Sequence, residues 1–268
     1  HGEQVLEVGR LRRERRSGGK TDALDAVRAA RSVLTGQAAL PRAGGQREAL
    51  RVLMAAREGA VNAKRAGMCQ LRDLLVTCPE PLRSELRALT ELQLLRQLAG
   101  SRPDQRRDPE LRGTGLALRA IARRVLQLRT EERELAVEIT TLVKTLAPQL
   151  LNETGVGPLT AAQILLAWSH QGRIRNEAAF ARLAGAAPIP ASSGQTVRYR
   201  LDRGGDRKLN RALHQILITR QRFHEPTITY IQKRLGDGKT RREATRCLKR
   251  YLARHLYRLL QNGAAATT

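Results

Sequence analysis

Apolar residues recur at alternating steps of three and four along residues 118–146. The positions in this seam are Leu118, Ile121, Val125, Leu128, Glu132, Leu135, Ile139, Leu142 and Leu146, and all but Glu132 are apolar. Such a heptad pattern predicts a long helix that pairs in a coiled coil or a helix hairpin. Its partner is either the earlier helices of this chain or the same helix of a second copy. The charge of Glu132 would cost stability there and could specify the register.

The residues before the seam predict a short strand followed by helices. Residues 4–8 alternate enough for a strand, and a helix opens within residues 20–26, where Thr21 is a suitable N-cap. Gly36 and Pro41 end that helix. Residues 46–98 predict helices broken at 78–81, whereas the prolines, glycines and charges of residues 101–115 predict a linker or an exposed loop.

The residues after the seam predict shorter helices. Residues 150–165 are typical of a short helix, a Gly-Val-Gly turn and a second helix with Pro158 in its first turn. A helix over 180–184 ends at Gly185, and a basic amphipathic helix covers 209–222. Residues 227–235 and 241–260 predict two more helices, and 263–268 a loose tail. The predicted fold class is mostly α.

The charge of the chain indicates a polyanionic partner. The 268 residues include 49 Lys and Arg against 25 Asp and Glu, which gives a net charge of +24. Such an excess repels itself unless phosphates or other anions neutralise it, so we expect nucleic-acid binding. A GC-rich genome would explain Arg in place of Lys, but not the excess of cations over anions.

The cysteines and the apolar runs bear on the compartment. Cys69, Cys78 and Cys247 are odd in number and lack CxxC spacing, so we expect reduced thiols in a cytoplasmic protein, with neither a disulfide framework nor a zinc site. No apolar run approaches the length that spans a membrane, and no signal peptide is visible. We therefore expect no membrane partner.

Asp22 and Asp25 lie three residues apart and so share one face of a helix. Two acids in a first turn interact favourably with the helix dipole, which is explanation enough in most proteins. They could equally be half of a carboxylate set for divalent metal ions, since clustered carboxylates hold the two metals of many nucleases and polynucleotide transferases. Lys20, just before them, would add a phosphate contact.

The Gly155-Val156-Gly157 turn has the form of a helix-hairpin-helix. Its glycines would let the backbone approach a phosphate, and the N–H groups that open the next helix would point at that phosphate. An ordinary tight connection between two helices explains the same residues equally well.

Ser193 lies after Pro188 and Pro190, which prevent a helix there, and before a basic helix. Gly194 would let the chain turn sharply and leave the hydroxyl exposed, although Ser-Gly on its own is more typical of a plain turn. A serine nucleophile needs nearby cations or a base. The cations that follow are Arg198, Arg200, Arg203, Arg207, Lys208 and Arg211. Of the histidines, only His224 is retained as a possible base.

Three segments, in this order, resemble DEDD-type insertion-sequence transposases of the IS110/IS1111 group. They are Lys20-Thr21-Asp22-Ala23-Leu24-Asp25-Ala26, the Gly155–Ala162 hairpin, and Leu183–Pro188 leading through Ser193-Gly194 to Arg203-Gly204-Gly205-Asp206-Arg207-Lys208-Leu209. The resemblance extends over nearly the whole chain. The Ser-Gly loop in its context is the most specific segment and the hairpin the least.

The resemblance implies three structural regions in the chain and a DNA recombination reaction. Residues 1–40 would end a RuvC-like (RNase H-like) α/β domain, 41–147 would form a helical coiled-coil region, and 148–268 a helical transposase domain. Such proteins recombine DNA with Mg²⁺ and a catalytic serine and are guided by a structured RNA. Asp22 and Asp25 match the last two acids of the DEDD set, and Ser193 matches the nucleophile, with Ser192 adjacent.

In that family the first Asp and the Glu of the set lie upstream, on strands that this chain does not contain. We therefore expect an N-terminally truncated transposase with half a metal site, in a bacterial cytoplasm and associated with the nucleoid. A homo-oligomer formed through the coiled coil would bring Asp22 and Asp25 of one copy towards Ser193 of another. The alternatives are a non-catalytic, basic nucleic-acid-binding protein and a structural coiled-coil scaffold.

Overall fold

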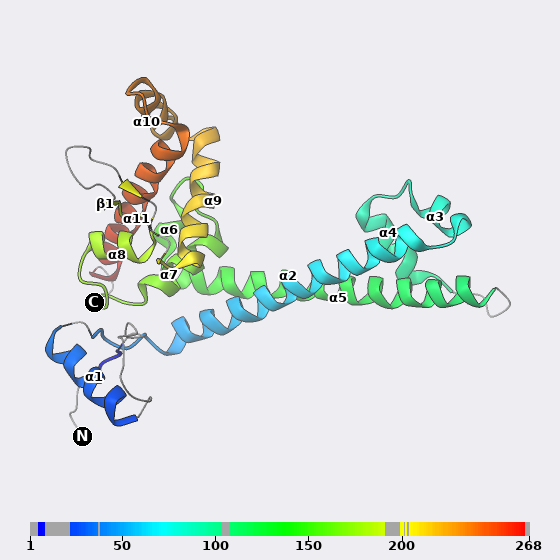
Figure 1. Cartoon of the computed structure of the whole chain (residues 1–268), viewed down its shortest axis with the longest axis horizontal. Helices are drawn as coiled ribbons and strands as arrows, with labels where there is room; N and C mark the ends of the chain where they lie inside the picture. Colours follow the sequence, from blue (N-terminus) through cyan, green and yellow to red (C-terminus); the bar gives the residue numbers. More distant parts are fainter. Residues whose placement is uncertain are drawn as a thin grey trace. The chain divides into compact units, whose positions relative to one another are not determined.

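The computed structural model describes residues 5–8, 22–36, 38–102, 108–190, 199–200, 202 and 204–265. These residues are mostly helical, as predicted, and they include one pair of very short strands (Figure 1). The chain divides into two compact units, residues 50–142 and residues 1–49 with 143–268. No helix within the described ranges is long and apolar enough to cross a membrane.

The unit of residues 50–142 is built on two long antiparallel helices. They are α2 (Gly45–Thr77) and α5 (Pro109–Leu146), and the shorter α3 (Glu80–Leu86) and α4 (Glu91–Gly100) follow α2. Leu71, Leu95 and Leu118 lie in one hydrophobic cluster formed by these helices. At Gly67 the helices α2 and α5 approach closely, because a Cβ there would lie 2.7 Å from Val125 Cγ2. The predicted helix over residues 118–146 is confirmed.

Glu132 is paired across this hairpin. Its carboxylate accepts hydrogen bonds from Arg57, at 2.7 Å, and from Lys64, and the Glu132 side chain is 18% exposed. The hydrogen bond from Lys64 is the main reason that the pKa of Glu132 is held below its usual range. Two cations of α2 therefore offset the cost expected for a charge in the seam, and α2 supplies the in-chain partner.

Where we expected a loop over residues 101–115, α5 has already begun at Pro109. The carboxylate of Asp108 accepts hydrogen bonds from the backbone N–H groups of Glu110 and Leu111. An Asp N-cap followed by Pro at the first helical position is a strong start signal, and it outweighs Gly113 and Gly115 inside the first turns. The loop prediction is wrong from Pro109 onward.

The C-terminal part of the other unit is a bundle of six helices among the described residues. These are α6 (Pro148–Leu151), α7 (Pro158–Trp168), α8 (Glu177–Leu183), α9 (Arg207–Phe223), α10 (Glu225–Gly236) and α11 (Arg241–Ala265). Helix α9 packs on α7, and α11 packs on α8, α9 and α10. Phe180, Leu213 and Ile216 are among its fully buried side chains. Arg254 of α11 donates to the Glu177 carboxylate of α8.

The N-terminal residues of that unit contain α1 (Asp22–Leu34), which stops before Gly36 at φ 66°. The strand expected over residues 4–8 is reduced, within residues 5–8, to an antiparallel bridge between Glu7 and Ala39. The Glu7 carboxylate also pairs with Arg173 Nη1 at 2.9 Å.

Candidate nucleic-acid interface

Two short strands hold the ends of the segment that contains Ser193. Strand β1 (Ile189–Pro190) pairs antiparallel with β2 (Tyr199–Arg200), with Ile189 opposite Arg200 and Pro190 opposite Tyr199. Residues 191–198, which include Ser192, Ser193 and Arg198, lie outside the described residues, as do Lys20 and Arg203.

The chain that leaves this β1–β2 stem presses against the end of α8. A Cβ on Gly205 would lie 2.3 Å from the Gly185 nitrogen and 2.8 Å from the Leu183 carbonyl oxygen. The Asp206 N–H donates to that same carbonyl oxygen at 2.6 Å, and Gly185 adopts a positive φ of 63°. The backbone contact requires glycine at 205, and it fixes where α9 begins.

The first turns of α9 present cations to solvent. Asp206 caps the helix, because its Oδ1 accepts from Lys208 N at 2.8 Å and Leu209 N at 3.0 Å. Arg207, Lys208 and Arg211 are exposed, and α9 contains five cations and no acid. Positive side chains near a helix N-terminus oppose the helix dipole, so helix stability does not explain them. Their position suits an external anion.

Lys249 of α11 is joined through Asn210 of α9 to Ala184, the residue that follows α8. Lys249 Nζ donates to Asn210 Oδ1 at 2.9 Å, and Asn210 Nδ2 donates to the Ala184 carbonyl oxygen at 2.6 Å. Burial, together with nearby Arg246, lowers the pKa of Lys249. Our sequence analysis missed this lysine. The signal was a cation four residues before buried Ala253, on the apolar stripe of α11.

The two glycines of the α6–α7 turn have different surroundings. Gly155 has a φ of 81°, and a Cβ there would lie 3.0 Å from the Ile216 carbonyl oxygen of α9. At Gly157 a Cβ would meet nothing within 4 Å, and its N–H donates to Thr160 Oγ1 at 3.0 Å. Gly155 therefore serves packing against α9, whereas Gly157 leaves the start of α7 open to approach.

Glu153 joins this turn to two helices of the bundle. Arg220 of α9 donates to its carboxylate at 2.6 Å and to the Thr154 carbonyl oxygen at 2.7 Å, and His255 of α11 lies 2.9 Å from the same carboxylate. Although burial acts to raise it, these hydrogen bonds hold the pKa of Glu153 below its usual range. Arg220 is only 8% exposed. In the sequence Arg220 looks like one more basic surface residue, but in the structure it is buried and makes a structural contact.

Asp22 and Asp25 lie in the first turn of α1, as predicted for residues one turn apart. Asp22 is exposed and Asp25 is partly buried. Within the described ranges, no group of three or more His, Cys, Asp or Glu side chains is arranged to hold a metal ion. The two acids thus share the first turn of α1, and no third His, Cys, Asp or Glu of the described residues forms a metal-binding group with them.

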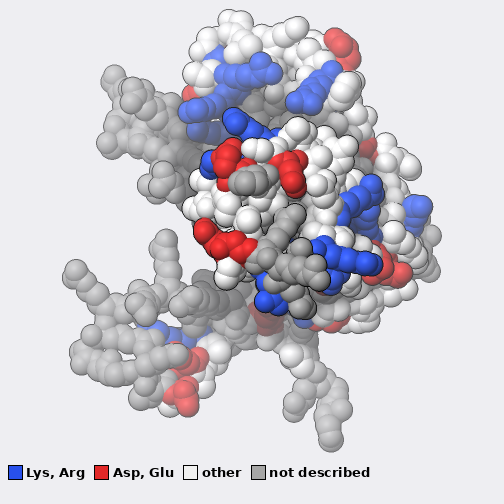
Figure 2. All heavy atoms as spheres, turned by 90° about the vertical axis from the view of Figure 1, so that its right-hand side faces the viewer, with Lys and Arg blue, Asp and Glu red and all other residues white. Residues whose placement is uncertain are grey.

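Basic side chains predominate on the helices of the bundle. Helix α11 contains seven cations and one acid, in addition to the cations of α9. In Figure 2, several Lys and Arg side chains and fewer Asp and Glu side chains are visible on the upper part of the drawn face, among many other residues. A surface of this kind attracts phosphate backbones through a salt-dependent interaction.

Comparison with known proteins finds relatives for part of this bundle. Residues 147–232 match the family model described as Transposase IS116/IS110/IS902 family. The insertion element IS110 uncharacterized 43.6 kDa protein of Streptomyces coelicolor is 29% identical over 157 residues, and the match covers 56% of this chain and 39% of that protein. The segment that contains the glycine turn, the β1–β2 stem and the basic start of α9 is therefore similar to transposases of the IS116/IS110/IS902 family.

Proposed function

We propose that this protein acts in DNA transposition, cutting and rejoining DNA with Ser193 as the nucleophile. The observation that carries the proposal is the family match over residues 147–232, since that range includes the stem whose loop contains Ser193. The exposed cations at the start of α9 support it, because they follow this loop directly in the chain. Residues 191–198 are themselves outside the described part.

The proposed step is a transesterification at phosphorus. Ser193 Oγ forms a bond to a DNA phosphate while the bond from phosphorus to a deoxyribose oxygen breaks, and the serine proton ends on that oxygen. The DNA is left attached to the serine until a second DNA hydroxyl reverses the exchange. Arg207, Lys208 and Arg211 would stabilise the negative charge on the phosphate oxygens.

Asp22 and Asp25 would hold Mg²⁺, and their oxygen ligands fit that ion. Two carboxylates together with substrate phosphates are a usual coordination for Mg²⁺. When bound, the ion would stabilise charge on the reacting phosphate. A pair of metal ions would need further carboxylates than the two that α1 provides.

A structured guide RNA and a second copy of the chain are the other partners that we propose. Support for RNA comes from the charge, because +24 exceeds what one short DNA contact would neutralise. Support for self-association comes from the seam itself, in which Leu128 and Leu135 remain only partly buried beside α2. Localisation at the bacterial nucleoid follows from the same proposal.

The test is a strand-transfer assay with donor DNA, guide RNA and Mg²⁺, run alongside a denaturing gel that detects DNA attached to protein. Ser193→Ala should abolish both the product and the covalent adduct, whereas Ser192→Ala should retain both. Adduct formation by Ser193→Ala would overturn the assignment. The absence of an adduct for the protein without any substitution would overturn it as well.

A non-catalytic nucleic-acid-binding protein is the second candidate. The small number of acidic residues favours this candidate. Helix α1 supplies only two, and no third potential ligand among the described residues forms a metal-binding group with them. Binding to DNA would then weaken steeply as salt rises, with no adduct under any condition. Replacing Arg207, Lys208 and Arg211 by Ala should lower the salt slope by about three if each contacts a phosphate.

A further inference from the structure

A cavity of about 350 Å³ lies among α9, α10 and α11 of the bundle. Leu217 and Leu252 are buried in its lining, and Tyr230 and Tyr251 form an aromatic side. The two tyrosine rings lie 5.9 Å apart, edge to face. The volume is within the range of small-ligand pockets, which begins at about 300 Å³.

The polar groups of this cavity are close to neutral in sum. Arg220 and His255 both pair with the Glu153 carboxylate. His224 Nδ1 lies 2.9 Å from Thr227 Oγ1, so Nε2 is the ring nitrogen that can meet a ligand. Burial lowers the pKa of His224, and the ring is therefore neutral at neutral pH, with one donor and one acceptor. Such a lining suits an uncharged planar ring better than a bare phosphate.

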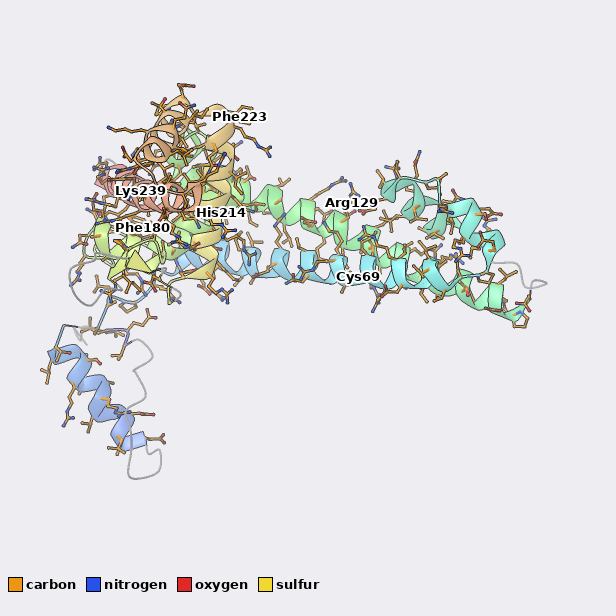
Figure 3. The ribbon with its side chains drawn as sticks, turned by 45° about the horizontal axis from the view of Figure 1, so that its top comes forward. Cys69, Arg129, Phe180, His214, Phe223 and Lys239 are labelled. Carbon is orange, nitrogen blue, oxygen red and sulfur yellow. The ribbon has the colours of Figure 1, made fainter. Side chains whose placement is uncertain are left out.

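Aromatic residues are scarce in this chain, and three of the seven line the cavity or lie next to it in the sequence. The sequence has one Trp, four Tyr and two Phe. Phe180, Tyr257 and Trp168 are buried in the bundle core. Phe223 is 75% exposed and directly precedes His224 of the cavity, and Tyr251 is 51% exposed. Figure 3 shows Phe223 at the outer end of α9, beyond His214.

An exposed aromatic beside a basic helix is a platform on which an unpaired base can stack. Burial in the core would account for an aromatic side chain without any ligand, but Phe223 and Tyr251 are not buried. The cations of α9 and α11 supply the charge that holds a phosphate backbone nearby. Bases in a duplex are already stacked, so a platform of this kind selects single strands.

We propose that this cavity receives an unstacked nucleobase from a single-stranded nucleic acid, with Tyr251 against the base. Tyr230, whose ring Arg234 already covers at 5.2 Å, holds Tyr251 from the side. Phe223 stacks a neighbouring base of the same strand. The inference rests on the proposed function in so far as the chain must bind nucleic acid. It adds a site for single strands whose lining includes none of the residues proposed for the serine chemistry.

The test compares strands with and without bases on the full chain. Fluorescein-labelled strands of about twelve nucleotides are titrated and followed by anisotropy. The strands are oligothymidine, oligouridine, a DNA backbone of abasic sites only, and a duplex. The protein should bind the strands with bases about tenfold more tightly than the abasic backbone. The arm that binds more tightly, DNA or RNA, identifies the source of the base.

Variants then assign the preference to the cavity. Tyr251→Ala should remove most of it while leaving duplex binding unchanged, and Tyr251→Phe should retain it. Leu235→Ala truncates an exposed apolar residue of α10 that does not line the cavity, so it should change nothing. Circular dichroism verifies that each variant is folded.

Two results would overturn the inference. One is equal affinity for the abasic backbone and the strands with bases. The other is a Tyr251→Ala variant that weakens every strand and the duplex by one common factor. In both cases nucleic-acid binding, and with it the proposed function, would survive. A chain that binds no nucleic acid would overturn both.

Discussion

The hairpin of α2 and α5 and the C-terminal bundle are both helical, but they are held together by different contacts. In the hairpin, side chains meet side chains in a repeating pattern, as Glu132 meets Arg57. The bundle has side-chain pairs as well, such as Arg254 with Glu177, but in addition its side chains reach backbone carbonyls far away in the sequence. Arg220 donates to Thr154, Asn210 to Ala184, and Tyr257 to Ile174 at 2.6 Å. Repeated contacts tolerate substitution, whereas a single contact to backbone requires one particular residue.

The largest expected effect is in the bundle, at Gly205. Gly205→Ala would place a methyl group against the backbone of Gly185 and Leu183, which has no side chain to move aside. We expect a loss of about 3 kcal/mol in unfolding free energy. Trp168 is the single tryptophan and lies in the bundle, so its fluorescence during urea unfolding reports this unit.

Gly204→Ala is the matched control. At that position a Cβ would meet only the Asp202 side chain, 3.3 Å away. Its effect should stay below about 1 kcal/mol. Equal losses for the two variants would show that the contact between Gly205 and α8 has no special weight.

A smaller effect is expected in the hairpin at Gly67. Gly67→Ala would crowd buried Val125, yet alanine is a better helix former than glycine by about 1 kcal/mol. We expect a net loss of about 1 kcal/mol in unfolding free energy. Circular dichroism during denaturation would measure it. Gly59→Ala, in the same helix and with open space beside it, should instead stabilise the hairpin by about 0.5–1 kcal/mol. Stabilisation by both variants would contradict the close approach of α2 and α5.

The smallest effect concerns the charge in the seam. The pKa of Glu132 is lower in the folded chain than the reference value of 4.5. Its ion pairs therefore stabilise the fold at neutral pH, and this contribution is lost as the pH falls from about 4.5 through the folded value. Glu132→Gln should cost about 1 kcal/mol at pH 7, and the difference from wild type should vanish in acid.

Glu134→Gln changes the charge by the same amount on the exposed side of α5. It should show no such convergence between neutral and acidic pH. A Glu132→Gln variant as stable as wild type at pH 7 would mean that Arg57 and Lys64 contribute nothing there.

Most helices of this chain could be predicted from the sequence, because their signals are local. The heptad steps predicted α5 over residues 118–146, and Pro158 after a glycine turn predicted the start of α7. The start of α5 was missed because the prolines, glycines and charges of residues 101–115 favoured a loop, and the cap at Asp108 was not considered.

The contacts that place the candidate site could not be predicted in this way. Strands β1 and β2 are too short to show alternation. Arg220 carries a charge that a sequence pattern assigns to the surface, and only the packing of α9 against its neighbours shows otherwise. Gly185 and Gly205 each look like ordinary turn glycines in the sequence. Nothing local indicates that the two turns are in contact.

The joint at Glu153 has a consequence for motion. Its carboxylate is shared by Arg220 of α9 and His255 of α11, so the α6–α7 turn cannot separate from the bundle without breaking contacts to both helices. Local fraying of that turn is therefore suppressed. Its backbone amides should exchange with deuterium only when the bundle opens as one cooperative unit, even though the turn itself lies next to solvent at Gly157.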